Sequence, residues 1–206
     1  MSTFSSPSRH HRSEFYGTYS DSSSFTVRIA QQEDLADLVE ILASSFPPQK
    51  EITRWLFPLI RMGIYEDLRQ RLRSPASPDY VCLVAVALSS NGSSQVIGTV
   101  EIALRSNYFF QVRSAYYPYL SNLAVHLEYR RRGVAQRLLS ACEQWVTNQG
   151  GHNIHLHVLE DNHDAKQLYF KVGYQFQKGD SFWCRWFLNQ PRRLLLHKQL
   201  GLVQQK

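Results

Sequence analysis

The sequence lacks any long apolar run. Among its 206 residues no stretch approaches the roughly 18 apolar residues that span a bilayer, and the first residues lack the apolar segment of a secretory signal. We therefore expect an intracellular protein with no membrane partner. The first 24 residues also lack Leu, Ile and Val and contain nine serines. Such a segment buries too little to order itself, so residues 1–24 are expected to form a disordered tail, with an organelle transit peptide as the alternative.

Cysteine is scarce, and the cysteines that are present are far apart. The wide spacing of Cys82, Cys142 and Cys184 excludes a CxxC pair for zinc or redox chemistry, so we expect three reduced core residues. His155 and His157 share one strand face, but neither a carboxylate nor a cysteine is evident as a third ligand. We therefore expect no metal site.

Acidic residues are fewer than basic ones, with 17 Asp and Glu against 23 Lys and Arg, which gives a net charge of +6. A chain with 43% hydrophobic and 19% charged residues has the composition of a folded domain, which excludes disorder over its full length. The positive charge fits either nucleic acid or a phosphorylated cofactor. Because the largest arginine cluster lies in one turn instead of along a groove between exposed rings, no nucleic-acid partner is expected.

From residue 25 onward the apolar pattern predicts one domain, over 25–206. Alternation predicts a strand at 25–29, and helical spacing predicts one helix over 32–46 and one or two more over 50–73, with a break at Pro58. Two strands, at 80–88 and 95–104, flank Asn91-Gly92, which favours an antiparallel hairpin.

The second half of the chain begins with an aromatic segment. Residues 106–119 are expected to form a loop whose rings either pack under the sheet edge or line a substrate groove. After it, periodicity predicts strand, helix, strand, helix and strand, at 120–125, 133–149, 153–159, 162–172 and 173–178.

A basic turn between a strand and a helix carries the clearest functional signal. The apolar strand residues 123–125 lead to Arg130-Arg131-Arg132-Gly133, and a helix opens at once. Backbone N–H groups and the positive end of a helix dipole then point at one place, which makes an anion site. The turn is neither a Walker loop nor a Rossmann fingerprint, because no Gly-Lys-Ser/Thr follows and two of three glycines are missing.

This turn resembles the signature of the GNAT superfamily of acetyl-CoA-dependent N-acetyltransferases. Arg130, Gly133 and Ala135 match the family pattern Arg/Gln-x-x-Gly-x-Gly/Ala, and Leu123-Ala124-Val125 resembles its bulged strand. The second family motif is matched downstream by Asn162, Ala165, Leu168, Tyr169 and Gly173-Tyr174. The resemblance spans roughly residues 25–200. It is greatest to plastid and cyanobacterial-type protein acetyltransferases, through residues 119–125, 168–174 and 192–195.

The resemblance implies both a fold and an activity. The fold would be α/β (α+β): a mixed, mostly antiparallel central sheet of about 6–7 strands flanked by helices, with a splayed strand at the acetyl-CoA site. The activity would be direct transfer of an acetyl group from acetyl-CoA to an amine of a protein or peptide, a lysine side chain or an N-terminus, in one ternary complex and without a metal. The compartment would be a bacterial cytoplasm or a plastid stroma.

The resemblance also assigns residues to the cofactor. Leu123 and Val125 would contact its arm through main-chain groups, residues 131–136 would hold its pyrophosphate, and Asn162 would combine a cofactor contact with a helix N-cap. The residues expected at the acetyl-CoA site are Leu123, Ala124, Val125, Arg130, Arg131, Arg132, Gly133, Val134, Ala135, Gln136 and Asn162.

Three residues are expected to take part in the chemistry. Tyr169 would protonate the departing thiolate as general acid, and the N–H of Val125 would meet the developing oxyanion. No acid occurs in residues 106–127, so His157, which stands where a family glutamate sometimes does, is the first candidate for the base. Glu101 and a water-relayed proton are the alternatives.

Other hypotheses about the function stay open. The acceptor could be a small-molecule amine, or the fold could bind acyl-CoA as a sensor without turnover. Residues 192–200 form a basic strand that either closes the sheet edge or lines the acceptor groove, and the positive charge disfavours a lysine-rich acceptor. A monomer and a homodimer are equally compatible with the sequence.

Overall fold

The fold is described by a computed structural model over residues 25–45, 57–73, 76–77, 79–88, 94–106, 116–179 and 192–201. The strands are β1 (Phe25–Ile29), β2 (Ala76–Ser77), β3 (Tyr80–Leu88), β4 (Ser94–Ser106), β5 (Tyr116–Val125), β6 (Asn153–Leu159), β7 (Gln175–Gly179) and β8 (Arg193–Gln199). The helices are η1 (Gln32–Asp34), α1 (Leu35–Ser45), α3 (Phe57–Arg71), η2 (Leu127–Tyr129), α4 (Val134–Asn148) and α5 (His163–Lys171), where η marks a short 3-10 helix.

The strands form one eight-stranded sheet in the order β1-β3-β4-β5-β6-β8-β7, and the short β2 pairs with β3. All pairs are antiparallel except β5 with β6, which is parallel. The prediction of a mixed, mostly antiparallel sheet flanked by helices is therefore confirmed. The basic strand β8 lies between β6 and β7, so the prediction that it closes the sheet edge is wrong, and β7 forms that edge.

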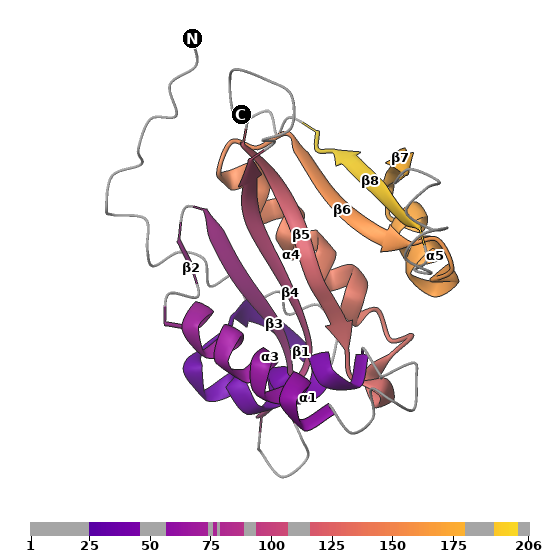
Figure 1. Ribbon diagram of the computed structural model, residues 1–206. Coiled ribbons are helices and arrows are strands. Elements are labelled where there is room, and N and C mark those ends of the chain that lie inside the picture. The colour runs from indigo at the N-terminus through magenta and orange to yellow at the C-terminus, as the bar shows by residue number, and fades with distance from the viewer. Residues whose placement is uncertain are drawn as a thin grey trace.

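Helices cover the central strands on both faces. β3 is buried at every position from Val81 to Ala87, because its side chains contact helices on either side. On one face Leu83 and Ala85 share a core with residues of α4, and on the other Val84 and Val86 pack with α1 and with the end of α3. Figure 1 shows α4 behind the sheet and α1 and α3 on the near face.

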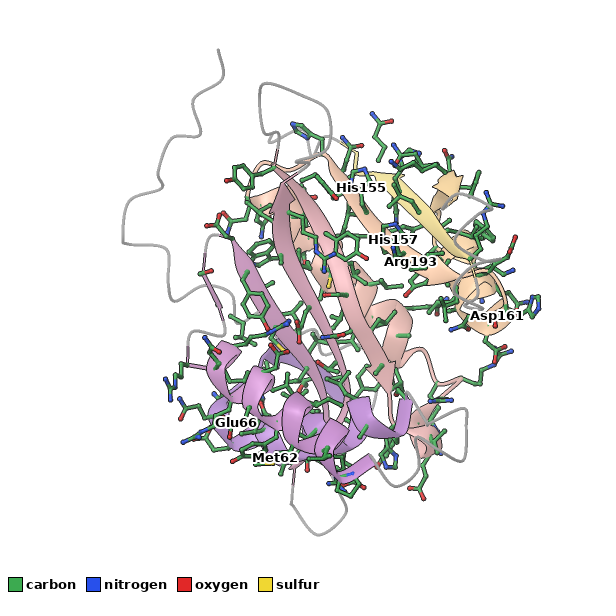
Figure 2. The ribbon with its side chains drawn as sticks, viewed as in Figure 1. Met62, Glu66, His155, His157, Asp161 and Arg193 are labelled. Atoms are coloured by element: carbon green, nitrogen blue, oxygen red, sulfur yellow. The ribbon has the colours of Figure 1, made fainter. Side chains whose placement is uncertain are left out.

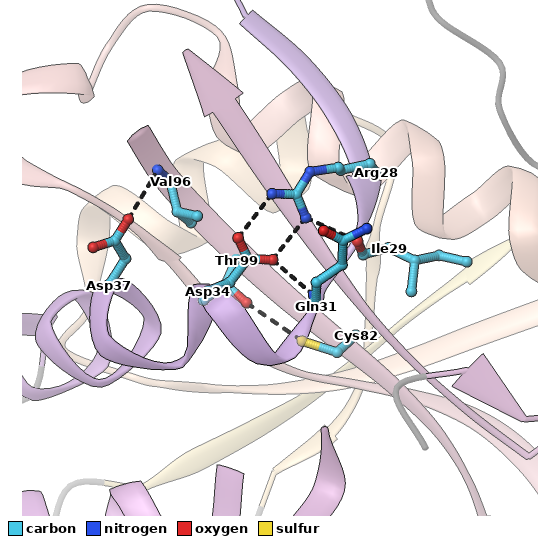
Figure 3. A network of polar contacts seen from close by, with 8 residues as sticks. All are labelled: Arg28, Ile29, Gln31, Asp34, Asp37, Cys82, Val96 and Thr99. Atoms are coloured by element: carbon cyan, nitrogen blue, oxygen red, sulfur yellow. Dashed lines mark hydrogen bonds and ion pairs between the residues drawn. The ribbon is translucent and has the colours of Figure 1, made fainter. Parts of the chain in front are cut away.

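A polar network fastens η1 and α1 to the sheet (Figure 3). Arg28 of β1 donates to both carboxylate oxygens of Asp34, at 2.6 and 2.7 Å, and the Gln31 N–H donates to the same carboxylate at 2.7 Å. Farther along, the N–H of Val96 in β4 donates to Asp37 of α1 at 3.2 Å. These bonds satisfy Asp34, which is only 6% exposed, and set the angle at which α1 meets the sheet.

One boundary differs from the sequence prediction, and another is described on one side only. β5 already begins at Tyr116, so the last part of the expected 106–119 loop is strand, as the aromatic residues there favour extended backbone. Pro118 is tolerated because β5 pairs with β6 only at Tyr119 and Leu120. α3 begins at Phe57, with Pro58 in its first turn, where proline fits, and the part of the expected helical region before the break, residues 50–56, lies outside the described residues.

Some predictions lie outside the described residues, namely the tail 1–24, the turn at Asn91-Gly92 and the core role of Cys184. Cys82 and Cys142 are buried and form no disulfide, as expected. No helix in the described parts of the chain has the length and apolar character needed to cross a membrane.

Candidate active site

The parallel strands β5 and β6 separate in the middle of the sheet. They pair at Tyr119 with His155 and at Leu120 with Leu156, and the remainder of each strand diverges (Figure 1). The predicted splayed strand is thus confirmed. Successive N–H groups of a strand point to opposite edges, and the N–H of His126 donates to Ile97 of β4 at 2.9 Å. The N–H groups of Val125 and Leu123 therefore face the gap between β5 and β6.

A bulge in β5 lies where this divergence begins, just after the last residue paired with β6. Thr99 of β4 lies opposite Ala124, but Glu101 lies opposite Ser121, so β5 carries one more residue than β4 between these pairs. Asn122 lies in the bulge with φ of 53°, in the left-handed region that asparagine tolerates better than most residues. Its side-chain amide donates to Glu101 at 3.1 Å, which holds the bulge in place.

We call the gap between the diverging parts of β5 and β6 the splay. Beside it, the basic turn leads into α4 as expected. Arg131 and Gly133 have φ of 62° and 82°, and these left-handed residues bring the chain round into the helix. The N-cap is Gly133, which makes no side-chain capping bond, and no acid lies in the first turn of α4. The first N–H groups of α4 are therefore available to an anion.

The three arginines of the turn have different surroundings. Arg130 donates from Nε to the carbonyl of Val125 at 3.1 Å, which fixes the turn to the end of β5. Arg131 lies 3.9 Å from Asp164 at the start of α5, and both side chains are highly exposed. The guanidinium of Arg132 lies 5.3 Å from the centre of the Tyr129 ring. Arg131 and Arg132 are thus exposed cations at the mouth of the splay.

Some of the expected cofactor residues have buried side chains, so only their backbone groups could contact a cofactor. Val134 and Ala124 are 2% and 6% exposed, and their side chains pack in the two cores. Ala135 and Gln136 are half-buried in the first turn of α4. Asn162 caps α5 by accepting a hydrogen bond from the N–H of Ala165 at 3.1 Å, so the predicted N-cap is confirmed.

Tyr169 of α5 is buried in the core shared by α4, β5 and β6, with only 7% of its surface exposed. Its ring makes an edge contact with Tyr174 at 5.6 Å. Burial raises the pKa of Tyr169 well above its ordinary value of 10.0, and the nearby hydroxyl of Tyr119 adds to the effect. The phenol therefore keeps its proton and can act only as a donor near neutral pH.

Tyr119 is the residue that the sequence analysis missed. Its hydroxyl and Nδ1 of His157 lie 3.0 Å apart, so a hydrogen bond joins the candidate base to a second phenol. Burial raises the pKa of Tyr119 as well, against opposing effects from Arg105, His157 and Arg193. The sequence held no signal for this contact, because Tyr119 was expected in the 106–119 loop and the contact depends on the register of β5 with β6.

Glu101, the second candidate base, is engaged elsewhere. It is 1% exposed, and its two oxygens accept from Arg71 of α3 at 2.5 Å and from Asn122 at 3.1 Å. Because donors of this chain occupy both oxygens, neither is available to an incoming amine, so this geometry favours His157 over Glu101 for the base.

The neighbouring histidines form ring contacts. His155 meets Tyr117 edge-on at 5.0 Å and stacks on His197 of β8 at 6.2 Å. Burial and His197 lower the pKa of His155, which keeps the ring neutral. Among the described residues, no group of three or more His, Cys, Asp and Glu side chains is placed to hold a metal ion.

The comparison with protein families gives one clear match. Residues 35–174, from the start of α1 to the end of the α5 turn, match the acetyltransferase (GNAT) family. Among curated proteins of Arabidopsis thaliana, GCN5-related N-acetyltransferase 10, chloroplastic, is 29% identical over 155 residues, which cover 71% of this chain and 60% of that protein. GCN5-related N-acetyltransferase 5, chloroplastic, is 26% identical over 196 residues, which cover 88% and 61%. The chain spans about three-fifths of the length of these two relatives.

Two solved structures illustrate proteins with the same fold. PaiA N-acetyltransferase from Thermoplasma acidophilum, in complex with coenzyme A, is 20% identical with a TM-score of 0.62 and covers 86% of this chain and 99% of its own. NAA60 from Arabidopsis thaliana, in complex with a bisubstrate analogue, is 17% identical, with the same TM-score and coverage. At these identities the likeness shows the fold alone. Together with the family match over residues 35–174, it shows that the chain belongs to the GNAT family of acetyltransferases.

Proposed function

We propose that the chain is an acetyl-CoA-dependent N-acetyltransferase that acts on a protein or peptide amine. The single observation that carries this proposal is the arrangement around the splay of β5 and β6. The uncapped start of α4 lies on one side, the Tyr119–His157 hydrogen bond lies where the two strands begin to separate, and Tyr169 is buried in the core that α4 forms with β5 and β6. Each of these parts has a role in acyl transfer from a phosphorylated carrier.

The site suits the proposed cofactor at two points. The first N–H groups of α4, with Arg131 and Arg132 beside them, provide donors and positive charge for a pyrophosphate. The N–H groups of Leu123 and Val125 face the splay and provide hydrogen bonds for an amide-containing arm. When bound, acetyl-CoA would supply an activated acetyl group as a thioester.

The chain's own side chains would manage the protons. His157 would accept the proton that the amine must lose before it attacks, and Tyr119 would orient the imidazole through the 3.0 Å hydrogen bond. The N–H of Val125 would stabilise negative charge on the carbonyl oxygen. The amine nitrogen would form a bond to the carbonyl carbon, and the C–S bond would then break. Tyr169 would donate a proton to the departing sulfur, and the acetyl group would stay on the nitrogen. The products are an acetylated amine and a free thiol.

A protein or peptide acceptor is supported by a structural neighbour. The NatC complex, with a TM-score of 0.60 and 18% identity, was solved bound to Gag peptide and CoA. NAA60 and Naa20 from Chaetomium thermophilum, the latter with a TM-score of 0.61 and 19% identity, were each solved with a bisubstrate analogue. The chloroplastic relatives support a plastid stroma as the compartment, and a bacterial cytoplasm is the alternative.

The experiment compares three forms of one peptide: a free N-terminus with an internal lysine, a blocked N-terminus with the lysine, and a free N-terminus without it. Acetyl-CoA is added, and each product is located by fragmentation mass spectrometry. We expect acetylation of at least one class of amine. Small-molecule amines are assayed in parallel, and turnover of these alone would reject a protein acceptor. Binding of acetyl-CoA without turnover of any amine would support the sensor reading instead.

A further inference from the structure

The helices in the described parts of the chain cover only part of one face of the sheet. α1 and α3 pack on β3, β4 and the end of β5, where Ala124 is the residue in contact. Toward the start of β5, and over β6 and β8, none of the described helices lies on this face (Figure 1). His155, His157 and Arg193 are displayed there, beside the splay (Figure 2).

The strand register defines which side chains share this face, because opposed residues of neighbouring strands point the same way. Arg105 lies opposite Tyr117, Tyr119 lies beside His155, and Leu159 lies opposite Arg193. We call the set the open face. Its members that matter here are Arg105, Tyr117, Tyr119, His155, His157 and Arg193.

The strands of the open face carry two exposed arginines and a single carboxylate. Within β4, β5, β6 and β8 the one carboxylate is Glu101, and Arg71 and Asn122 occupy both of its oxygens. Arg105 and Arg193, both exposed, interact electrostatically with the Tyr119 hydroxyl. A ligand on this face therefore meets positive charge that Glu101 does not offset.

Arg105 holds a defined position next to the proposed chemistry. Its guanidinium lies 3.7 Å from the centre of the Tyr119 ring, and the hydroxyl of that ring contacts His157. Arg28, Arg69 and Arg71 each pair with a carboxylate of this chain. Arg105 has no such partner among the described residues, and stacking leaves the edge of its guanidinium open to a ligand.

We propose that the open face binds an acceptor peptide with an acidic residue close to the reacting amine, and that Arg105 holds this carboxylate. The inference rests on the proposed acetyltransferase function and adds its substrate class. A guanidinium pairs with a carboxylate through two parallel hydrogen bonds, which fixes orientation as well as affinity. The same positive charge repels a lysine-rich peptide. The open face would therefore select acidic acceptor peptides both by attracting them and by repelling basic ones.

The test uses three peptides that differ only near the N-terminus, where they carry Glu, Gln or Lys. Peptide-dependent thiol release gives kcat/KM for each, and fluorescence anisotropy gives the affinity of labelled peptides in the presence of coenzyme A. For the wild-type chain we expect kcat/KM of the Glu peptide to exceed that of the Lys peptide about tenfold or more at low salt, and less at high salt. Arg105→Gln should bring the ratio to within about twofold, and Arg105→Glu should invert it.

Arg61→Gln is the matched control, because it removes the same charge from an exposed position on α3. This variant should keep the wild-type ratio. Equal use of the Glu and Lys peptides by the wild-type chain would overturn the inference and leave the acetyltransferase proposal intact, and so would an unchanged ratio in Arg105→Gln. If no peptide is acetylated, the proposed function fails, and anisotropy still decides whether Arg105 selects the acidic peptide.

Discussion

At the scale of single residues, Glu101 is a charged side chain buried in the sheet. Arg71 and Asn122 satisfy its oxygens, and it joins α3 to the bulge that splays β5 from β6. Glu101→Ala would leave both donors without their acceptor. We expect a loss of about 2–4 kcal/mol in the free energy of unfolding, measured by urea denaturation, together with a higher KM for acetyl-CoA.

Asp67 is the matched control, since it also pairs with Arg71, at 2.9 Å, but its side chain is 55% exposed. Asp67→Ala should cost only about 0.3–0.5 kcal/mol. Equal losses from the two variants would contradict a structural role for Glu101. Loss of activity in Glu101→Gln with full stability and an unchanged KM would favour the base role instead.

The buried tyrosines predict how stability depends on pH. Burial raises the pKa values of Tyr169 and Tyr174 above 10.0, and that of Cys142 above 9.0. Above about pH 9 the unfolded chain releases these protons while the folded chain keeps them, so the free energy of unfolding falls as pH rises. Below that pH the contribution is fully present. The expected slope approaches about 1.4 kcal/mol per pH unit for each group, measured by urea denaturation from about pH 8 to about pH 11.

Tyr174→Phe removes one of these groups at little cost, because its buried hydroxyl has no hydrogen-bond partner among the described residues. The variant should therefore show a shallower slope. Tyr65→Phe, on the exposed surface of α3, should show the wild-type slope. A free energy of unfolding that stays constant over this range would contradict the account.

At the scale of elements, the turn before α4 depends on Gly133. A methyl group at this position would meet no atom within 4 Å, so substitution acts only through the φ of 82°. Gly133→Ala should lower the free energy of unfolding by about 1 kcal/mol. Because this φ aims the first N–H groups of α4, the dissociation constant for acetyl-CoA, measured by calorimetry, should rise about fivefold or more.

Gly150, beyond the other end of α4, has φ of 77° and the same empty surroundings. Gly150→Ala should cost similar stability and leave the acetyl-CoA affinity unchanged. If both variants bind acetyl-CoA as tightly as the wild type, the start of α4 is not the anion site.

Local pattern predicted some elements accurately and others poorly. β3 and β6 have the predicted bounds, because each is an apolar or alternating run between turn residues. The start of β5 was missed, because proline and polar residues among the aromatics resemble a loop. The place of β8 between β6 and β7 was also missed, since the order of strands depends on tertiary packing that no local pattern records.

At the scale of the whole molecule, the family resemblance predicted the family and the splay, and the local pattern predicted the basic turn, because its conformation depends on Arg131 and Gly133 within the turn itself. The Tyr119–His157 pair joins residues 38 positions apart, through the register of two parallel strands. The engagement of Glu101 likewise needs α3, whose arginine comes from 30 positions earlier. A single sequence does not specify such contacts, so the candidate base could be named from sequence but not its partner.

The central claim is that the splay of β5 and β6 is an acetyl-transfer site in which Tyr169 is the acid. The most direct measurement is peptide-dependent thiol release from acetyl-CoA by the wild type, Tyr169→Phe and the control Tyr65→Phe. We predict that kcat falls about tenfold or more in Tyr169→Phe with acetyl-CoA affinity retained, and that Tyr65→Phe matches the wild type. Equal kcat in all three proteins would contradict the acid role, and absence of peptide-dependent release from the wild type would contradict the proposed function.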